Sequence, residues 1–98
     1  MSYNLRWTER AANDYEKLVD YLLEKWGVEI TIDVTQQFEH TITHIQNSPE
    51  HFPIVIVKKK IRRCVASPQT SIYFTADKGT VEILTLFDNR QNPEKLKL

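Results

Sequence analysis

A cluster of positive charge is the first feature of this sequence that can do chemistry. The stretch IVKKKIRRC, residues 56–64, places five Lys and Arg side chains in the six positions from Lys58 to Arg63. If this stretch forms a β-strand, side chains alternate between its two faces, and Lys58, Lys60 and Arg62 line one face together. Such a stripe can bind carboxylates or phosphates. The simpler alternative is a solvated edge strand that lysines protect from aggregation.

The histidines and the cysteine are the other reactive side chains. His40 and His44 are four residues apart on a predicted helix, a spacing that can bind a metal ion. No third ligand lies nearby in the sequence, so we expect no metal, no cofactor, and an exposed or partner-facing histidine pair. His51 lies beside Glu50 in a loop, where it could act as an acid or base. Cys64 follows two arginines that could lower its pKa, and a half-buried strand thiol is the simpler interpretation.

The composition indicates a single small globular domain, residues 1–98. With 41% hydrophobic and 27% charged residues, the chain does not have the composition of a disordered protein. A chain of 98 residues is too short for two separate cores. No apolar run approaches the roughly 18 residues of a membrane span, the start lacks the apolar core of a secretory signal, and one cysteine cannot form an internal disulfide. We therefore expect a soluble, cytoplasmic protein without membrane association.

The net charge of zero hides a polarity along the chain. Residues 1–50 carry a balance of −5, and residues 51–98 carry a balance of +5. Charge asymmetry of this kind bears on association and not on fold. It predicts an acidic protein or a nucleic acid as the partner of the second half.

Two amphipathic helices must position these groups. Thr8 has the hydroxyl that caps a helix, apolar residues recur every three or four positions from Ala11 to Trp26, and Gly27 follows at the C-terminal end. A second stripe runs from Val34 to Ile45. With Gly27 almost alone between them, the helices are predicted to form an antiparallel hairpin. Four aromatic residues are expected in its core: Trp7, Tyr15, Trp26 and Phe38.

β-strand patterns flank this hairpin. Residues 3–7 alternate as a short strand does, and DKG at residues 77–79 is a hairpin turn signal. After the helices, residues 54–58 and 61–67 are β-rich, residues 70–76 alternate, and residues 80–88 form the last strand pattern. The last of these is apolar on both faces, as in a central strand covered on both sides, and an irregular tail follows it. The sequence predicts an α+β fold, β-α-α-β-β-β, with the N-terminal helical hairpin packed on one face of a small, mainly antiparallel sheet.

These motifs, taken in order, resemble the RelE/ParE superfamily. The similar segments are WTE after the first strand, KWG at the end of the first helix, SPEHFP after the second helix, IRRC with TSIYF, and VEILTLFDNRQNP. Members of this superfamily are toxins of bacterial type II toxin–antitoxin modules, often described as plasmid stabilisation proteins. The resemblance covers the whole chain and implies a cognate antitoxin as partner, in a toxin–antitoxin hetero-oligomer.

The superfamily divides by mechanism into RelE-like mRNA interferases, which cut messenger RNA on the ribosome, and ParE-like inhibitors, which bind DNA gyrase. The endonucleases need cations and an acid or base around the scissile phosphate. Carried over by position, that catalytic set would be Lys60, Arg62, Arg90 and His51. Two of its usual members are missing, because the third-strand arginine position falls on Ser71 and the C-terminal tyrosine position falls near Leu96.

The segments TSIYF and FDNRQNPEKL look more like ParE-like toxins, and the neutral chain also differs from strongly basic ribosome-binding endonucleases. The resemblance therefore favours a non-enzymatic DNA gyrase inhibitor. An mRNA endonuclease remains the alternative, and a small nucleic-acid-binding or adaptor domain is the third hypothesis. The residues expected to bind the target or the antitoxin are Lys58, Lys60, Arg62, Phe87 and Arg90.

Overall fold

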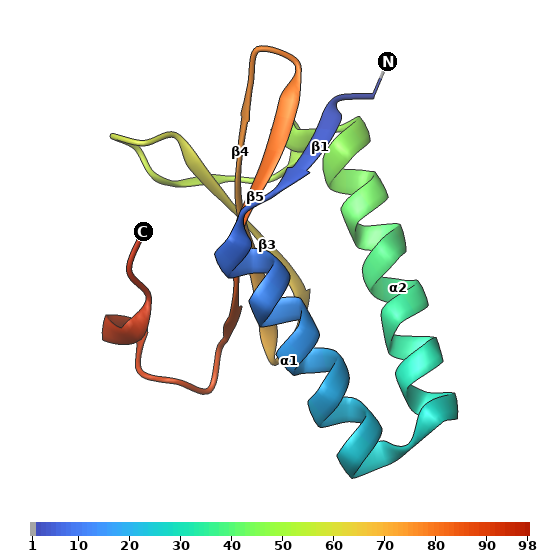
Figure 1. The fold of residues 1–98 in the computed structure, drawn as a ribbon. Coiled ribbons are helices and arrows are strands. Elements are labelled where there is room, and N and C mark those ends of the chain that lie inside the picture. The colour runs from blue at the N-terminus through green and yellow to red at the C-terminus, as the bar shows by residue number, and fades with distance from the viewer. Residues whose placement is uncertain (1) are drawn as a thin grey trace.

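The computed structural model describes residues 2–98 and places a helical hairpin on one side of a five-stranded sheet (Figure 1). Along the chain the elements are β1 (Asn4–Trp7), α1 (Glu9–Trp26), α2 (Val28–Asn47), the 3₁₀-helix η1 (Pro49–His51), β2 (Ile54–Ile56), β3 (Ile61–Ser67), β4 (Thr70–Asp77), β5 (Thr80–Asp88) and the 3₁₀-helix η2 (Pro93–Lys95). The predicted α+β order is confirmed, and the short edge strand β2 precedes the three longer strands.

Local sequence signals set the ends of the helical hairpin. The Thr8 hydroxyl oxygen accepts the main-chain N–H of Ala11 at 3.0 Å and donates to the carbonyl oxygen of Leu84 at 2.8 Å. The predicted cap therefore also ties the start of α1 to β5. Gly27 alone separates the two helices, at a φ of 85°, where a side chain would be strained. The predicted antiparallel hairpin is confirmed.

The sheet is mixed and has the strand order β1-β5-β4-β3-β2. β1 runs parallel to β5, and the other neighbours are antiparallel. The predicted turn at residues 77–79 joins β4 to β5, with φ values of 49° at Lys78 and 79° at Gly79. β5 is an interior strand, as expected. The strand at the centre of the sheet is β4, in which four consecutive residues, 71–74, are buried.

Side chains pack on both faces of the sheet. The larger core lies between the hairpin and the sheet and centres on Phe38, Ile45 and Phe74. A smaller cluster on the opposite face is built from Ile61, Tyr73 and Phe87, and Leu96 and Leu98 of the C-terminal segment pack against it. Figure 1 shows this segment on the side of the sheet away from the helices. The predicted irregular tail thus contains one 3₁₀ turn and covers part of the second face.

The basic stretch differs from its prediction. Ile56 pairs directly with Ile61, so the four residues between them, 57–60, must reverse the chain and form a turn. Lys60 has a φ of 53° in this turn. The expectation that Lys58, Lys60 and Arg62 line one strand face is therefore wrong, because alternation requires a continuous strand.

Trp26 also differs from its prediction. Its side chain is 54% exposed, whereas Trp7, Tyr15 and Phe38 stack against one another with ring centroids 5.0–6.2 Å apart. As the last residue of α1, next to the single residue that joins the helices, Trp26 lies at the tip of the hairpin. The helical spacing placed Trp26 on the correct stripe, but it could not show how far the sheet extends beneath it.

Candidate protein-binding groove

The cations of the basic stretch have two different environments. Lys58, Lys59 and Lys60 are exposed in the turn between β2 and β3. Arg62 is half-buried on β3, and its Nη1 donates to the carbonyl oxygen of Phe52 at 2.6 Å. Arg62 therefore fastens the loop before β2 to the sheet. The three lysines, referred to below as the lysine turn, are the part of the basic stretch that is open to a partner.

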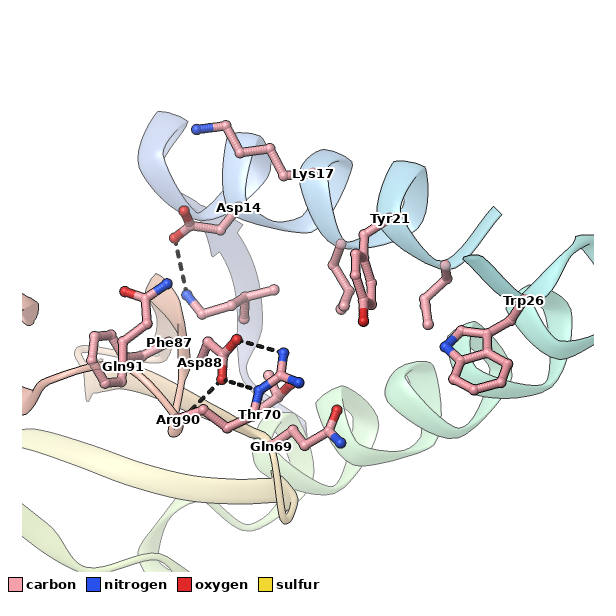
Figure 2. A pocket seen from close by; sticks show the side chains of 13 residues that line it. Asp14, Lys17, Tyr21, Trp26, Gln69, Thr70, Phe87, Asp88, Arg90 and Gln91 are labelled. Carbon is pink, nitrogen blue, oxygen red and sulfur yellow. Dashed lines mark hydrogen bonds and ion pairs between the residues drawn. The ribbon is translucent and has the colours of Figure 1, made fainter. Parts of the chain in front are cut away.

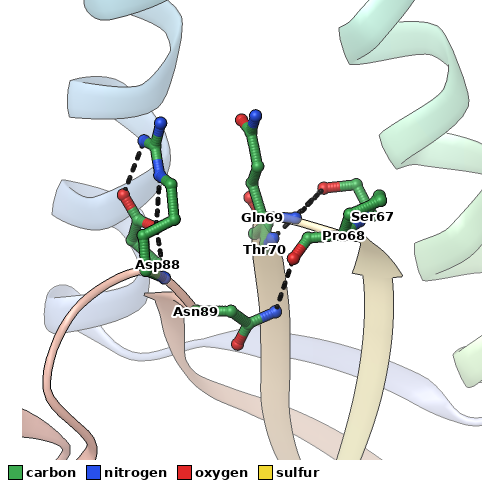
Figure 3. A network of polar contacts seen from close by, with 7 residues as sticks. Ser67, Pro68, Gln69, Thr70, Asp88 and Asn89 are labelled. Atoms are coloured by element: carbon green, nitrogen blue, oxygen red, sulfur yellow. Dashed lines mark hydrogen bonds and ion pairs between the residues drawn. The ribbon is translucent and has the colours of Figure 1, made fainter.

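Arg63 takes part in a hydrogen-bond chain that joins three segments. Its Nε donates to the Ser71 hydroxyl at 3.0 Å, and that hydroxyl donates to Oδ1 of Asn89 at 2.8 Å. Asn89 Nδ2 reaches the carbonyl oxygen of Pro68 at 3.5 Å (Figure 3). Ser71, onto which the resemblance carries the endonuclease arginine position, is fully buried and bonded to both Arg63 and Asn89. Sequence reasoning missed this hydrogen-bond chain, although the buried serine directly before the apolar residues 72–74 of β4 belongs to it.

Arg90 is held in place by its neighbour Asp88. Oδ1 of Asp88 accepts Nε of Arg90 at 3.0 Å and its main-chain N–H at 2.9 Å, and Oδ2 accepts Nη2 at 2.8 Å (Figure 2). These bonds hold the pKa of Asp88 below its ordinary value and raise the pKa of Arg90. Both side chains remain partly exposed. The structure thus presents an oriented guanidinium that keeps further N–H donors for a partner.

Arg90 lies at one end of a groove between the distal half of the hairpin and the ends of β3, β4 and β5. A cavity of about 370 Å³ lies beside Arg90 and α1 (Figure 2). A second cavity of about 320 Å³ continues between both helices and the β3–β4 turn. The two cavities adjoin one another and are together called the groove below; they share five lining residues: Leu18, Leu22, Trp26, Gln69 and Thr70.

The walls of the groove have the chemistry of a protein interface. Tyr21, Trp26 and Ile30 are 41%, 54% and 44% exposed along it. Lys25 lies 5.5 Å from the ring centroids of both Tyr21 and Trp26 and is the main cause of the lowered pKa of Tyr21. Exposed aromatic side chains next to Arg90 match the residue types enriched at the centres of protein interfaces. The groove can therefore take an apolar segment that ends in an acidic group.

The predicted interface residues do not form one surface. Arg90 belongs to the groove, the lysine turn lies at the far edge of the sheet, and Arg62 is occupied by Phe52. Phe87 lines the same cavity as Arg90, but it is only 9% exposed because it also belongs to the cluster beneath the C-terminal segment. Sequence reasoning missed the groove itself, because its walls come from segments far apart in the chain. Within the sequence, the only local indication of the groove was the pair of aromatic residues near the end of α1, which the structure leaves exposed.

The histidines pair in an unexpected way. Nε2 of His44 and Nδ1 of His51 are 3.2 Å apart, so His44 pairs with the loop histidine instead of with His40. Across residues 2–98, no three His, Cys, Asp or Glu side chains gather closely enough to hold a metal ion. The Cys64 thiol is buried, and burial raises its pKa to about 11, so the alternative of a lowered pKa is wrong.

Residues 5–93 match the family model described as the ParE toxin of the type II toxin–antitoxin system parDE. The chain belongs to this ParE toxin family. No curated protein sequence matches it. A solved structure of the chromosomal ParDE system from P. aeruginosa is 19% identical, with a TM-score of 0.74 over 89% of this chain and 96% of that one.

Two structures from Helicobacter pylori have the same fold at a TM-score of 0.58 each. One is a copper-bound mutant toxin, 19% identical over 90% of this chain and 96% of that one. The other is the solution structure of a conserved hypothetical protein, 16% identical over 91% of this chain and 97% of that one. At these identities the likeness supports the fold, and the family model supplies the assignment to the ParE toxins.

The ParE fold separates the residues of the alternative catalytic set. Arg62 pairs with Phe74 and Asp88 pairs with Thr70, four residues away along β4. At about 3.3 Å per residue, this offsets the main chains of Arg62 and Asp88 by roughly 13 Å along the strand direction. His51 and Lys60 belong to the Arg62 end by their position in the chain. The main chains of these residues are therefore offset along the sheet from the end at which Arg90 lies.

Neither helix of this ParE family member, within residues 2–98, combines the length and apolar character needed to span a membrane.

Proposed function

We propose that this ParE family member is a DNA gyrase inhibitor that acts by binding, without hydrolytic chemistry, and that a cognate antitoxin silences it in the cytoplasm. The observation that carries this proposal is the separation of Arg90 from Arg62, together with the pairing of Arg90 with Asp88. A transesterifying endonuclease needs a base, an acid and positive charge around one phosphate. An inhibitor needs an anchoring surface, and the groove beside Arg90 supplies one.

The antitoxin is proposed to place an apolar segment in the groove. Trp26, Tyr21 and Ile30 leave apolar area exposed there, and a disordered antitoxin segment can fold against it on binding. Acidic residues of the same antitoxin would meet Arg90 or the lysine turn. This arrangement covers the toxin surface at rest, and in this way the module would stabilise the plasmid or chromosome that carries it.

The test is to add the purified protein to two reconstituted reactions. We expect gyrase supercoiling of relaxed plasmid to stop while translating ribosomes keep their messenger RNA intact. Addition of the protein encoded by the neighbouring gene should restore supercoiling. Codon-phased messenger RNA cuts with supercoiling untouched would contradict the proposal and support the endonuclease instead.

A further inference from the structure

Two exposed histidine side chains meet where α2 ends, and neither of them lines the groove. His44 lies in the last turn of α2, and His51 is the last residue of η1. Nε2 of His44 and Nδ1 of His51 are 3.2 Å apart, with the two ring planes at 76°. The inhibitor proposal does not use this pair and does not explain it.

The protein positions this histidine pair from two sides. The main-chain N–H of Ser48 donates to the carbonyl oxygen of His44 at 2.9 Å, and the N–H of His51 donates to that of Ser48 at 3.0 Å. The His44 ring packs edge-on against Phe52, with ring centroids 4.9 Å apart, and Phe52 packs edge-on against the buried ring of Phe74 at 5.8 Å. The main chain and the core together therefore limit how far apart the two imidazole rings can lie.

The separation of the two nitrogens suits a shared metal ion. A histidine nitrogen lies about 2.0–2.1 Å from a bound Zn²⁺, so a separation of 3.2 Å corresponds to an N–Zn–N angle of about 100°, close to tetrahedral. In the hydrogen-bonded pair, one neutral ring donates its proton to the other. To bind an ion, the donating ring carries that proton on its other nitrogen instead, and both exposed rings turn slightly so that their lone pairs meet at the ion.

The ligand set indicates which ions the pair can bind. Neutral imidazole suits Zn²⁺ and Ni²⁺, whereas Mg²⁺ and Ca²⁺ prefer oxygen ligands. Within residues 2–98, no third His, Cys, Asp or Glu side chain joins the pair, so water would complete the coordination of the ion. The one thiol of the chain, that of Cys64, is buried and is not a competing ligand.

We propose that His44 and His51 bind one divalent transition-metal ion of the Zn²⁺ or Ni²⁺ type, and that this ion joins the end of α2 to η1. The ion adds a link between the hairpin and the loop that Arg62 fastens to the sheet through the carbonyl oxygen of Phe52. Such a link stabilises the folded chain, because the unfolded chain does not hold the two rings at this separation. A hydrogen bond alone is the other explanation of the pair, and it predicts no binding of these ions.

The test titrates ZnCl₂ into the full chain, purified without a histidine tag, and follows the ring C–H resonances of the three histidines by NMR. We expect saturation at one ion per chain, with the resonances of His44 and His51 shifting together and those of His40 almost unchanged. The same concentration of MgCl₂ should shift none of them. Thermal unfolding should move to a higher temperature with ZnCl₂, since the ion binds the folded chain. These measurements do not involve gyrase, so their result is independent of the inhibitor proposal.

Three alanine variants locate the ion, and all three replace exposed side chains, so each should fold. His44→Ala and His51→Ala should each weaken Zn²⁺ binding at least about tenfold, because even the loss of a group behind a metal ligand costs about that much. Both should also lose the thermal shift. His40→Ala is the matched control, because it removes a histidine of the same helix outside the pair, and it should bind Zn²⁺ as the native chain does.

Three results would overturn the proposal. Equal losses in His40→Ala and His51→Ala would place the ion on the helix, at the pair His40 and His44. Equal responses to ZnCl₂ and MgCl₂ would show that the pair has no preference for a transition metal. Absence of saturable Zn²⁺ binding would leave the hydrogen bond as the whole explanation of the pair.

Discussion

The hydrogen bonds that a side chain makes within the protein fix the direction in which it can bind another molecule, as Arg90 illustrates. Asp88 fixes its guanidinium at the end of the groove through three hydrogen bonds. Under the inhibitor proposal, Arg90→Ala should weaken gyrase binding by about 2 kcal/mol or more, as loss of an interface arginine does. Asp88→Asn should give a smaller loss, because the arginine remains but is oriented less firmly.

The measurement is a titration of supercoiling inhibition with each purified variant. Lys95→Ala is the matched control, because it removes an exposed cation from the same terminal segment outside the groove. Unchanged inhibition by Arg90→Ala would show that the target binds elsewhere. Sequence reasoning identified Arg90 but not Asp88 as its partner, since the turn after β5 sets that geometry.

Cys64 gives a second prediction for a single residue. Its pKa of about 11 in the folded protein leaves about one thousandth of the thiol as reactive thiolate at pH 8, whereas an ordinary cysteine is about one quarter thiolate. Ellman's reagent should therefore react at least about 100-fold more slowly with the folded protein than in concentrated urea. Because folding raises this pKa, the contribution of Cys64 to stability is complete below about pH 8.5 and is lost as the pH rises towards 11. Equal rates in both states would contradict the burial of Cys64.

At the scale of elements, the hairpin should carry much of the stability of the fold. Leu22 is 8% exposed on the inner side of α1, so Leu22→Ala should lower the free energy of unfolding by about 2–5 kcal/mol. Its position on the wall of the groove favours the lower end of this range, because the site is open on one side. Leu23→Ala removes the same atoms from a side chain that is 43% exposed and serves as the control. Urea titration of both variants measures the difference, and equal losses would show that the hairpin packs on another face.

The helices were predictable because their signals are local, whereas the lysine turn was not. Thr8 and Gly27 mark the ends of α1 within the sequence itself. The turn at residues 57–60 contains neither Gly nor Pro, and its β-rich flanks predict a continuous strand. What reverses the chain there is the pairing of Ile56 with Ile61, together with the register shift between Ile54 and Ile56. Pairing of this kind depends on the assembled sheet, and the same is true of the groove walls and of the contact between Ser71 and Asn89.

At the scale of the molecule, the charge difference between the two halves of the chain becomes a difference between the helical layer, which is acidic, and most of the sheet, which is basic. Residues 1–50, with a balance of −5, form β1 and the hairpin, whereas residues 51–98, with a balance of +5, form most of the sheet and the C-terminal segment. The lysine turn lies at the edge of the basic layer, far along the sheet from β1. An acidic antitoxin should therefore be drawn towards this edge first, and its apolar segment should then settle into the groove.

This order of events can be tested by reversing the three charges of the lysine turn, with Lys58→Glu, Lys59→Glu and Lys60→Glu in one variant. The association rate with the antitoxin should fall and lose most of its salt dependence, whereas the dissociation rate should change less, because groups at the rim of an interface act mainly on encounter. The control is Lys78→Glu, which reverses one lysine in the turn between β4 and β5. Its effect on the association rate should be smaller than one third of the effect of the triple variant. Trp26→Ala should have the opposite effect, with faster dissociation and an almost unchanged association rate. An aromatic side chain that becomes buried in the complex contributes after the two proteins have met. If both variants altered only dissociation, the basic layer would belong to the docked interface itself, and long-range attraction would not guide the antitoxin to the toxin.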